Sequence, residues 1–215
     1  MSKVRVAGFT VSADGYGADI EQSLEAPMGK RGHDTFSWFF GTKSFRSMIG
    51  KEGGATEGPD AEFARLSMHG FGAFVMGRNM FGAERGPWKD LSWKGWWGDD
   101  PPYHAPTFIL THHPRESITM EGGTTFHFVT GGIEDALERA KKAAGEKDVK
   151  IGGGVATFRQ YLQARLIDSL HLAIAPVFIG QGEALFAGID LPTLGYEIVD
   201  RQTSEHATHL VIERK

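Results

Sequence analysis

Three segments of the sequence combine residues that suit the binding of anionic groups. FVMGRNMF (74–81), FVTGGIEDAL (128–137) and KIGGGVATF (150–158) each pass from an apolar strand pattern through glycine into a helical pattern. A helix N-terminus has unpaired backbone N–H groups and a partial positive charge, and glycine lets an anion approach that backbone closely. If the strands are parallel, the junctions gather at one edge of the sheet. Together they could bind the phosphates of a dinucleotide.

The glycine triplet also matches part of a dinucleotide fingerprint. Gly152, Gly154 and Thr157 have the spacing of the Gly-x-Gly-x-x-Gly motif, with threonine in place of the last glycine. The match comes late in the chain rather than at the first strand, which argues against an ordinary Rossmann domain. A tight turn with close packing is the alternative role for the triplet.

Two groups of side chains add hydrogen-bond donors at strand ends. Arg78 follows Gly77, and its guanidinium suits the 2′-phosphate that distinguishes NADP from NAD. The alternative for Arg78 is a surface salt bridge. Thr111, His112 and His113 follow another apolar run and could reach the ribose phosphate or the pyrophosphate. The alternative for either histidine is a solvated loop position.

The order of the patterns predicts an α/β fold. Strands that alternate with helices predict a mostly parallel sheet, and two final strands with no helix between them predict an antiparallel C-terminal edge. The expected strands, about eight in number, lie near 3–11, 72–76, 107–111, 125–130, 149–151, 170–177, 196–202 and 208–214. The expected helices cover 34–40, 60–70, 133–144 and 155–166.

Two irregular stretches, 41–59 and 82–106, are predicted to be long surface loops that act as lids or binding walls. The second carries four tryptophans, which either fold the loop onto the body or contact substrate or a second subunit: Trp88, Trp93, Trp96 and Trp97.

The composition narrows the class of partner. The chain of 215 residues has a net charge of -4 and no strong basic block, and no apolar run approaches the roughly 20 residues that cross a bilayer. We therefore expect one domain over 1–215 and a small-molecule partner, not nucleic acid or a membrane. The absence of cysteine excludes disulfides and thiolate catalysis. The first residues lack a secretion-signal pattern, so we expect a cytoplasmic protein.

Motifs along nearly the whole chain, outside the two loops, resemble the dihydrofolate-reductase-like family, which includes the C-terminal reductase domain of the bifunctional deaminase-reductases of bacterial riboflavin biosynthesis. The motifs are VSADG (11–15), VMGRNMF (75–81), ILTHHP (109–114), VTGGIEDALERA (129–140), IGGGVATFRQYL (151–162) and DSLHLAIAPVFIGQGEALF (168–186). The resemblance implies a three-layer fold with a central mixed, eight-stranded sheet flanked by about four helices. It also implies NADPH bound across the strand ends and a homodimer.

The resemblance further implies hydride transfer from NADPH to an electron-poor C=N or C=O carbon of a pteridine or ribosylaminopyrimidine type of substrate, as in reductases of dihydrofolate or of 5-amino-6-(5-phosphoribosylamino)uracil. The turn at 12–15 would border the nicotinamide. The residues assigned to the cofactor by the junctions and the resemblance are Gly15, Gly77, Arg78, Asn79, Met80, Thr111, His112, His113, Thr130, Gly131, Gly132, Gly152, Gly153, Gly154, Val155, Ala156 and Thr157.

A proton donor should accompany the hydride. Dihydrofolate reductases have a carboxylate on the first helix, and Asp34 lies in about that place, although it could instead be a helix N-cap. Asp14 is the second candidate, with turn formation before Gly15 as its alternative role. Four basic residues could recognise a substrate phosphate, without a sign that they face the pocket: Lys30, Arg31, Lys43 and Arg46.

Other catalytic classes lack their motifs. The chain has nine histidines, but His206 and His209, three apart on a predicted strand, should point to opposite faces, and no His-Glu-x-x-His helix exists. We therefore expect no metal site. A Gly-x-Ser-x-Gly elbow and a Walker A loop are also missing. A non-catalytic nucleotide-binding protein on the same fold stays open as the alternative to a reductase.

Overall fold

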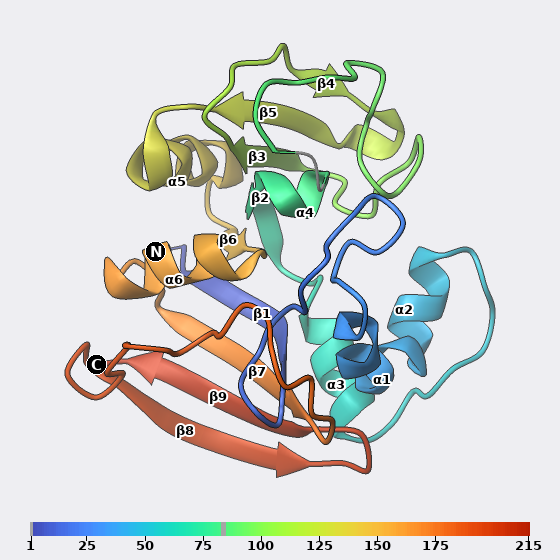
Figure 1. The fold of residues 1–215 in the computed structure, drawn as a ribbon, viewed down its shortest axis with the longest axis vertical. Helices are drawn as coiled ribbons and strands as arrows, with labels where there is room; N and C mark the ends of the chain where they lie inside the picture. Colours follow the sequence, from blue (N-terminus) through green and yellow to red (C-terminus); the bar gives the residue numbers. More distant parts are fainter. Residues whose placement is uncertain (1, 83–84) are drawn as a thin grey trace.

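One twisted sheet of nine strands forms the centre of the molecule in the computed structural model, which describes residues 2–82 and 85–215 (Figure 1). The strand order is β4-β5-β3-β2-β6-β1-β7-β9-β8. The strands are β1 (Val4–Ser12), β2 (Phe71–Gly77), β3 (Pro106–Leu110), β4 (Ile118–Thr119), β5 (Thr125–Val129), β6 (Asp148–Ile151), β7 (Ser169–Ala175), β8 (Tyr196–Thr203) and β9 (Thr208–Arg214).

The strands from β5 to β7 are parallel, so their carboxyl ends meet at one edge of the sheet. At the far side β9 pairs antiparallel with β7 and with β8. The predicted mixed, mostly parallel sheet with an antiparallel C-terminal edge is thereby confirmed. The predicted number of eight strands is slightly wrong, because β4 is also present. With two residues, β4 is too short to produce a pattern in the sequence.

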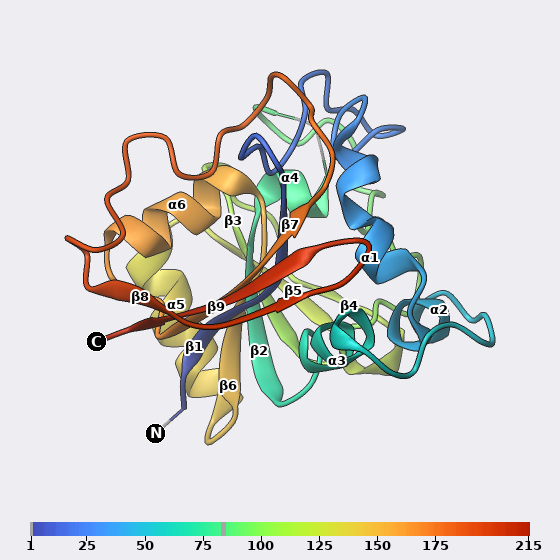
Figure 2. The same ribbon diagram turned by 90° about the horizontal axis from the view of Figure 1, so that it is seen from below.

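Helices cover both faces of the sheet (Figure 2). They are η1 (Gly32–Phe36), α1 (Ser37–Phe40), α2 (Lys43–Met48), α3 (Pro59–Leu66), α4 (Arg78–Phe81), η2 (Glu121–Gly123), α5 (Gly132–Ala144) and α6 (Val155–Gln163). The predicted helix at 34–40 is a 3₁₀ turn followed by one α-helical turn. The expectation of about four helices is too low, because α2 lies inside the predicted loop 41–59 and α4 is a single turn.

The main core lies between the sheet and the helices α5 and α6. It buries Leu137 and Ala140 of α5 and Phe158 and Leu162 of α6 against β-branched residues of the central strands. The helical periodicity of these apolar residues gave the correct positions of both helices. On the opposite face Trp38 of α1 and Phe63 of α3 form a second, smaller cluster. The sheet is therefore the middle of three layers.

Among the described residues no helix is long and apolar enough to span a membrane.

Candidate functional site

A cavity of about 1140 Å³ opens at the carboxyl edge of the parallel strands. It is large for a small-molecule site, since pockets of roughly 300–1,000 Å³ are typical. The predicted cofactor residues that line it come from all three glycine junctions and from the end of β3: Gly77, Arg78, Asn79, Met80, Thr111, His112, His113, Thr130, Gly132, Gly152, Gly153, Gly154, Val155, Ala156 and Thr157. Two predicted residues, Gly15 and Gly131, do not line it.

The glycine triplet joins two strand ends at this edge. The Gly77 N–H donates to the Gly153 carbonyl at 2.8 Å, and the Gly152 N–H donates to the Val75 carbonyl at 2.7 Å. A Cβ atom at Gly77 would collide with the Thr157 hydroxyl, so the glycine at this position permits close packing. A Cβ at Gly154 would meet no protein atom within 4 Å. Close packing and an open approach for a ligand are thus both present in this one turn.

The three junctions differ in how well they suit an anion. The first turn of α6 contains no acidic residue, and its N-cap Gly154 makes no side-chain cap. The first turn of α5 carries Glu134 and Asp135, whose negative charges already complement that helix end. A Cβ at Gly131 would collide with the Asp135 carboxylate, which explains why this glycine faces its own helix and not the cavity. The N-terminus of α6 is the better anion site.

Arg78 reaches the cavity wall from the first position of α4. Its Cζ lies 3.7 Å from the centroid of the Trp88 ring, and Nη1 donates to the Gly86 carbonyl. The Trp88 indole in turn donates to the His113 carbonyl at 2.9 Å. Arg115 does not line the cavity, because it donates to the carbonyls of Leu91 (2.8 Å) and Trp93 (2.7 Å). These contacts hold the loop 82–106 against the ends of β2 and β3.

Seven aromatic residues line the same cavity, and we call this part of its wall the aromatic compartment: Phe36, Phe39, Phe40, Phe45, Trp96, Trp97 and Tyr103. The first four come from the segment η1 to α2 and the others from the loop 82–106. Trp88 and Trp93 attach that loop to the body, which is the first of the two roles expected for the tryptophans, and Trp96 and Trp97 line the cavity. The second role, contact with substrate or a second subunit, stays a prediction. Burial raises the pKa of Tyr103 to about 12, so its hydroxyl stays protonated.

The two predicted proton donors lie outside the cavity. Asp14 accepts hydrogen bonds from the backbone N–H groups of Ile179 (3.2 Å) and Gly180 (2.7 Å). A side-chain hydrogen bond from Ser12 and these backbone donors keep the Asp14 pKa below its usual value, which favours the ionised, turn-forming role. Asp34 is 55% exposed, within 3.8 Å of Arg31, and lies inside η1 rather than at a helix N-cap. The four basic residues proposed for a substrate phosphate do not line the cavity either.

Two ionisable residues that sequence patterns missed line the cavity instead. Lys150 belongs to β6, where the short pattern VKI gave only a strand signal. Glu183 is the one carboxylate among the described residues of the lining, and it accepts a hydrogen bond from Gln22 Nε2 at 3.0 Å. Glu183 belongs to the GQGEALF motif, which is the signal that could have identified it.

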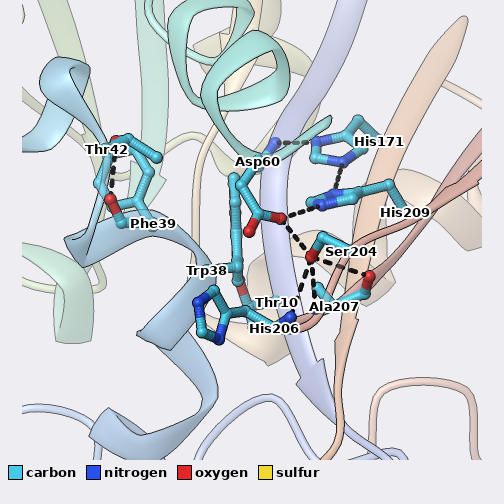
Figure 3. A network of polar contacts seen from close by, with 11 residues as sticks. Thr10, Trp38, Phe39, Thr42, Asp60, His171, Ser204, His206, Ala207 and His209 are labelled. Atoms are coloured by element: carbon cyan, nitrogen blue, oxygen red, sulfur yellow. Dashed lines mark hydrogen bonds and ion pairs between the residues drawn. The ribbon is translucent and has the colours of Figure 1, made fainter. Parts of the chain in front are cut away.

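A buried histidine pair is part of a network of polar contacts (Figure 3), and this network reaches Gly8 of the cavity lining. The Gly8 N–H donates to His171 Nδ1 at 3.1 Å, so His171 must carry its proton on Nε2 when neutral. That Nε2–H faces His209 Nδ1 at 3.0 Å, and His209 Nε2 then donates to Asp60 Oδ1 at 2.7 Å. Burial, followed by the proximity of His209 and Lys150, lowers the pKa of His171 to about 3. The chain of bonds therefore contains a neutral His171.

This network supports an irregular part of β1 that lines the cavity. The pairing of β1 with β7 shifts register between Val6 and Phe9, and Gly8 within the shift has φ +79°. Because of the shift, the Gly8 N–H needs a partner, which His171 supplies. His206 joins the network only through its backbone, since its N–H donates to Ser204 Oγ at 3.0 Å and Ser204 Oγ donates to Asp60 Oδ1 at 2.7 Å. His206 lies in the turn before β9 rather than on a strand, which corrects the reason given above for separating it from His209.

Comparisons with known proteins agree with this architecture. The model of the RibD C-terminal domain family matches residues 4–210. A protein from Shewanella sp. PV-4, described as a riboflavin biosynthesis protein, is 22% identical with a TM-score of 0.63, over 100% of this chain and 99% of its own. Dihydrofolate reductase from Enterococcus faecalis, solved with NADP(H) and RAB-propyl, is 16% identical with a TM-score of 0.51, over 99% of this chain and 96% of its own.

A third structure is longer than this chain. The diaminohydroxyphosphoribosylaminopyrimidine deaminase/5-amino-6-(5-phosphoribosylamino)uracil reductase of Thermotoga maritima is 13% identical with a TM-score of 0.57, and the match covers 100% of this chain but 57% of that protein. No curated protein sequence gives a significant match. At these identities the structures show a shared fold, whereas the family model spans almost the full length. The chain belongs to the family of the RibD C-terminal domain.

Proposed function

We propose that this protein is an NADPH-dependent reductase that transfers hydride to an electron-poor C=N or C=O carbon of a small heterocyclic or sugar-linked substrate. The observation that carries the proposal is the single cavity that joins the glycine junctions to the aromatic compartment. The family membership of this chain supports the proposal, as does its structural similarity to two proteins that are described as reductases. The cofactor would supply the hydride, and the protein would supply position, charge and the exclusion of water.

The residues at the glycine end fit a dinucleotide. The open space next to Gly154 and the acid-free first turn of α6 suit the pyrophosphate, whose oxygens would accept hydrogen bonds from the free N–H groups of α6. Arg78 suits the 2′-phosphate, because a guanidinium held over the Trp88 ring loses less freedom when it makes a bidentate contact. Thr111, His112 and His113 would add donors from the end of β3.

The aromatic compartment fits a planar substrate. Flat heterocycles stack on aromatic rings, and a mostly apolar wall excludes water from the reacting carbon. The Tyr103 hydroxyl is a neutral donor that could orient a ring nitrogen or oxygen. The substrate itself, the homodimer and the cytoplasmic location remain predictions.

Binding and turnover test the proposal separately. Titration with NADPH should shift the fluorescence of the coenzyme in a saturable way, and NADH should bind more weakly. With dihydrofolate and with 5-amino-6-(5-phosphoribosylamino)uracil as probes, loss of the absorbance of reduced coenzyme should accompany turnover of one of them. A protein that leaves coenzyme fluorescence unchanged would contradict the proposal.

The alternative is a nucleotide-binding protein without catalysis. It is favoured by one observation, namely that neither Asp14 nor Asp34 lines the cavity. Saturable binding of NADPH together with no oxidation of the coenzyme in the presence of either probe would support this alternative over the reductase.

A further inference from the structure

Lys150 lies on the same face of the sheet as the aromatic compartment. Its neighbours along β6, Val149 and Ile151, are buried in the main core on the other face. Because side chains alternate along a strand, Lys150 points to the opposite face. Its Nζ donates to the Ser67 carbonyl at 2.6 Å and lies 3.6 Å from Met68 Sδ. Lys150 is nevertheless one of the residues that line the cavity, and the residue as a whole keeps some accessible surface.

The charges around Lys150 leave its ammonium without a carboxylate partner in the part of the chain that the structure describes. Arg5, its neighbour on β1, forms an ion pair with Asp148 at 3.1 Å. His171 on β7 is neutral, and Tyr103 from the loop 82–106 is protonated. Burial, and secondarily the positive charge of Arg5, lowers the pKa of Lys150 to about 7. The amine can therefore gain and lose a proton at neutral pH.

The position of Lys150 also relates it to the coenzyme site. It precedes Gly152 by two residues on β6, and a strand rises about 3.3 Å per residue, so roughly 7 Å of rigid backbone separates it from the glycine triplet. A small planar molecule in the aromatic compartment would lie in the same cavity as Lys150 and the glycine triplet.

We propose that Lys150 is the proton donor of the reduction, an assignment that rests on the function proposed above. The new C–H bond takes a hydride, with its electron pair, from the reduced coenzyme, which is thereby oxidised. The π bond of the C=N or C=O group breaks and its electron pair moves to the heteroatom. The heteroatom takes a proton from Nζ, the N–H bond breaks, and the neutral amine regains a proton from water. The ammonium also stabilises the negative charge that develops on the heteroatom.

Glu183 is the competing donor, and it differs from Lys150 in position and in charge. It is held by Gln22, next to the backbone of Gly17 and Ala18. A donor active as a protonated amine loses activity as the pH rises through about 7, which is the profile expected if Lys150 is the donor. Glu183→Gln removes the competing carboxyl and should leave this pH profile in place.

The first test measures the amine itself and needs no substrate. Fluorodinitrobenzene, a planar aromatic electrophile that reacts with neutral amines, would label the intact protein over a pH series, and peptide mass spectrometry would follow each lysine. Lys150 should react with a midpoint near pH 7 in the folded protein, and in the urea-unfolded protein near the lysine reference value of about 10.4. A folded-state midpoint equal to the unfolded one, or no reaction of Lys150 in the folded protein, would overturn the assignment whether or not the protein is a reductase.

The second test compares Lys150→Arg, Lys150→Met and the control Lys147→Met. Both Lys150 variants should bind NADPH within about twofold of the wild type, while kcat with the accepted probe falls on the order of 10²–10⁴-fold. Lys150→Arg keeps the positive charge, so its KM should equal that of the wild type. Its kcat should not fall as the pH rises through 7, because a guanidinium stays protonated there. A wild-type pH profile in Lys150→Arg would overturn the donor role. Binding of NADPH without turnover in the wild type would overturn it together with the reductase, even if labelling shows an amine that titrates near pH 7.

Discussion

Lowering the pH from 7 to 5 is expected to destabilise this protein through His171. The pKa of His171 is lowered from 6.5 to about 3, mainly by burial, so the folded protein keeps this residue neutral while the unfolded chain takes up a proton below pH 6.5. The unfolded state then binds more protons, and the free energy of unfolding falls as the pH falls. At 1.36 kcal/mol per pH unit below the unfolded pKa, the loss between pH 7 and pH 5 amounts to about 2 kcal/mol.

The substitution His171→Asn isolates this contribution. Asparagine can still accept the Gly8 N–H but does not titrate, so the variant should be destabilised at pH 7 by about 1–3 kcal/mol while losing about 2 kcal/mol of pH dependence. Urea unfolding at a series of pH values gives both quantities. The exposed His206→Asn is the control and should keep the wild-type slope.

The contributions of other titrating groups cancel when the pH dependence of the free energy of unfolding is compared between the wild type and the variant. His127 and Lys150 also have lowered pKa values, and they contribute to the wild type and to the variant with the same sign. Equal slopes in wild type and His171→Asn between pH 7 and pH 5 would refute the argument that a neutral, buried His171 links β7 to the cavity wall.

Three further substitutions test the cofactor site. Arg78→Ala should lower the affinity for NADPH by roughly tenfold or more, because a charge-assisted hydrogen bond contributes about 1.5–3 kcal/mol, and should leave the affinity for NADH nearly unchanged. Calorimetric titration with both coenzymes measures the two affinities, and equal losses would show that Arg78 does not bind the 2′-phosphate. Gly153→Val should abolish binding of either coenzyme with the fold intact by circular dichroism, since a Cβ there comes no closer than 3.5 Å to Met80 Sδ; unaltered affinity would leave the triplet a packing feature. Gly77→Ala should destabilise the protein by about 1–3 kcal/mol, because the added Cβ collides with the Thr157 hydroxyl. In the double variant with Thr157→Ala, thermal unfolding should show that part of this stability is recovered, whereas additive effects of the two substitutions would contradict the contact.

The glycine end of the site could be predicted because its chemistry is in the backbone. A strand, a glycine and a helix in succession determine where free N–H groups lie, and parallel pairing brings successive strand ends to one edge. For this reason Gly77, Gly153 and Thr130, far apart in the sequence, line one cavity. The exception was Gly131, whose orientation depends on the contact with Asp135 within its own helix.

The substrate end could not be predicted from local patterns. Tyr103 and Lys150 belong to different segments, and their approach depends on how the loop 82–106 folds over the sheet. Asp34 was chosen by position on the first helix, but a 3₁₀ turn places its carboxylate at the surface. In both cases side-chain direction is set by tertiary packing, which a single strand or helix pattern does not encode.

Two parts of the cavity wall, the glycine junctions and the aromatic compartment, come from different kinds of structural element, which affects how the sequence can evolve. The glycine end consists of strand termini, where a substitution disturbs the whole sheet, whereas the aromatic compartment is contributed by the segment from η1 to α2 and by the loop 82–106. Under the proposed function, insertions and replacements in those segments would alter which substrate is accepted and leave the coenzyme site unchanged. Under the proposed function, relatives with the same β2, β5 and β6 junctions but different segments at 32–48 and 82–106 are expected to share a coenzyme and differ in what they reduce.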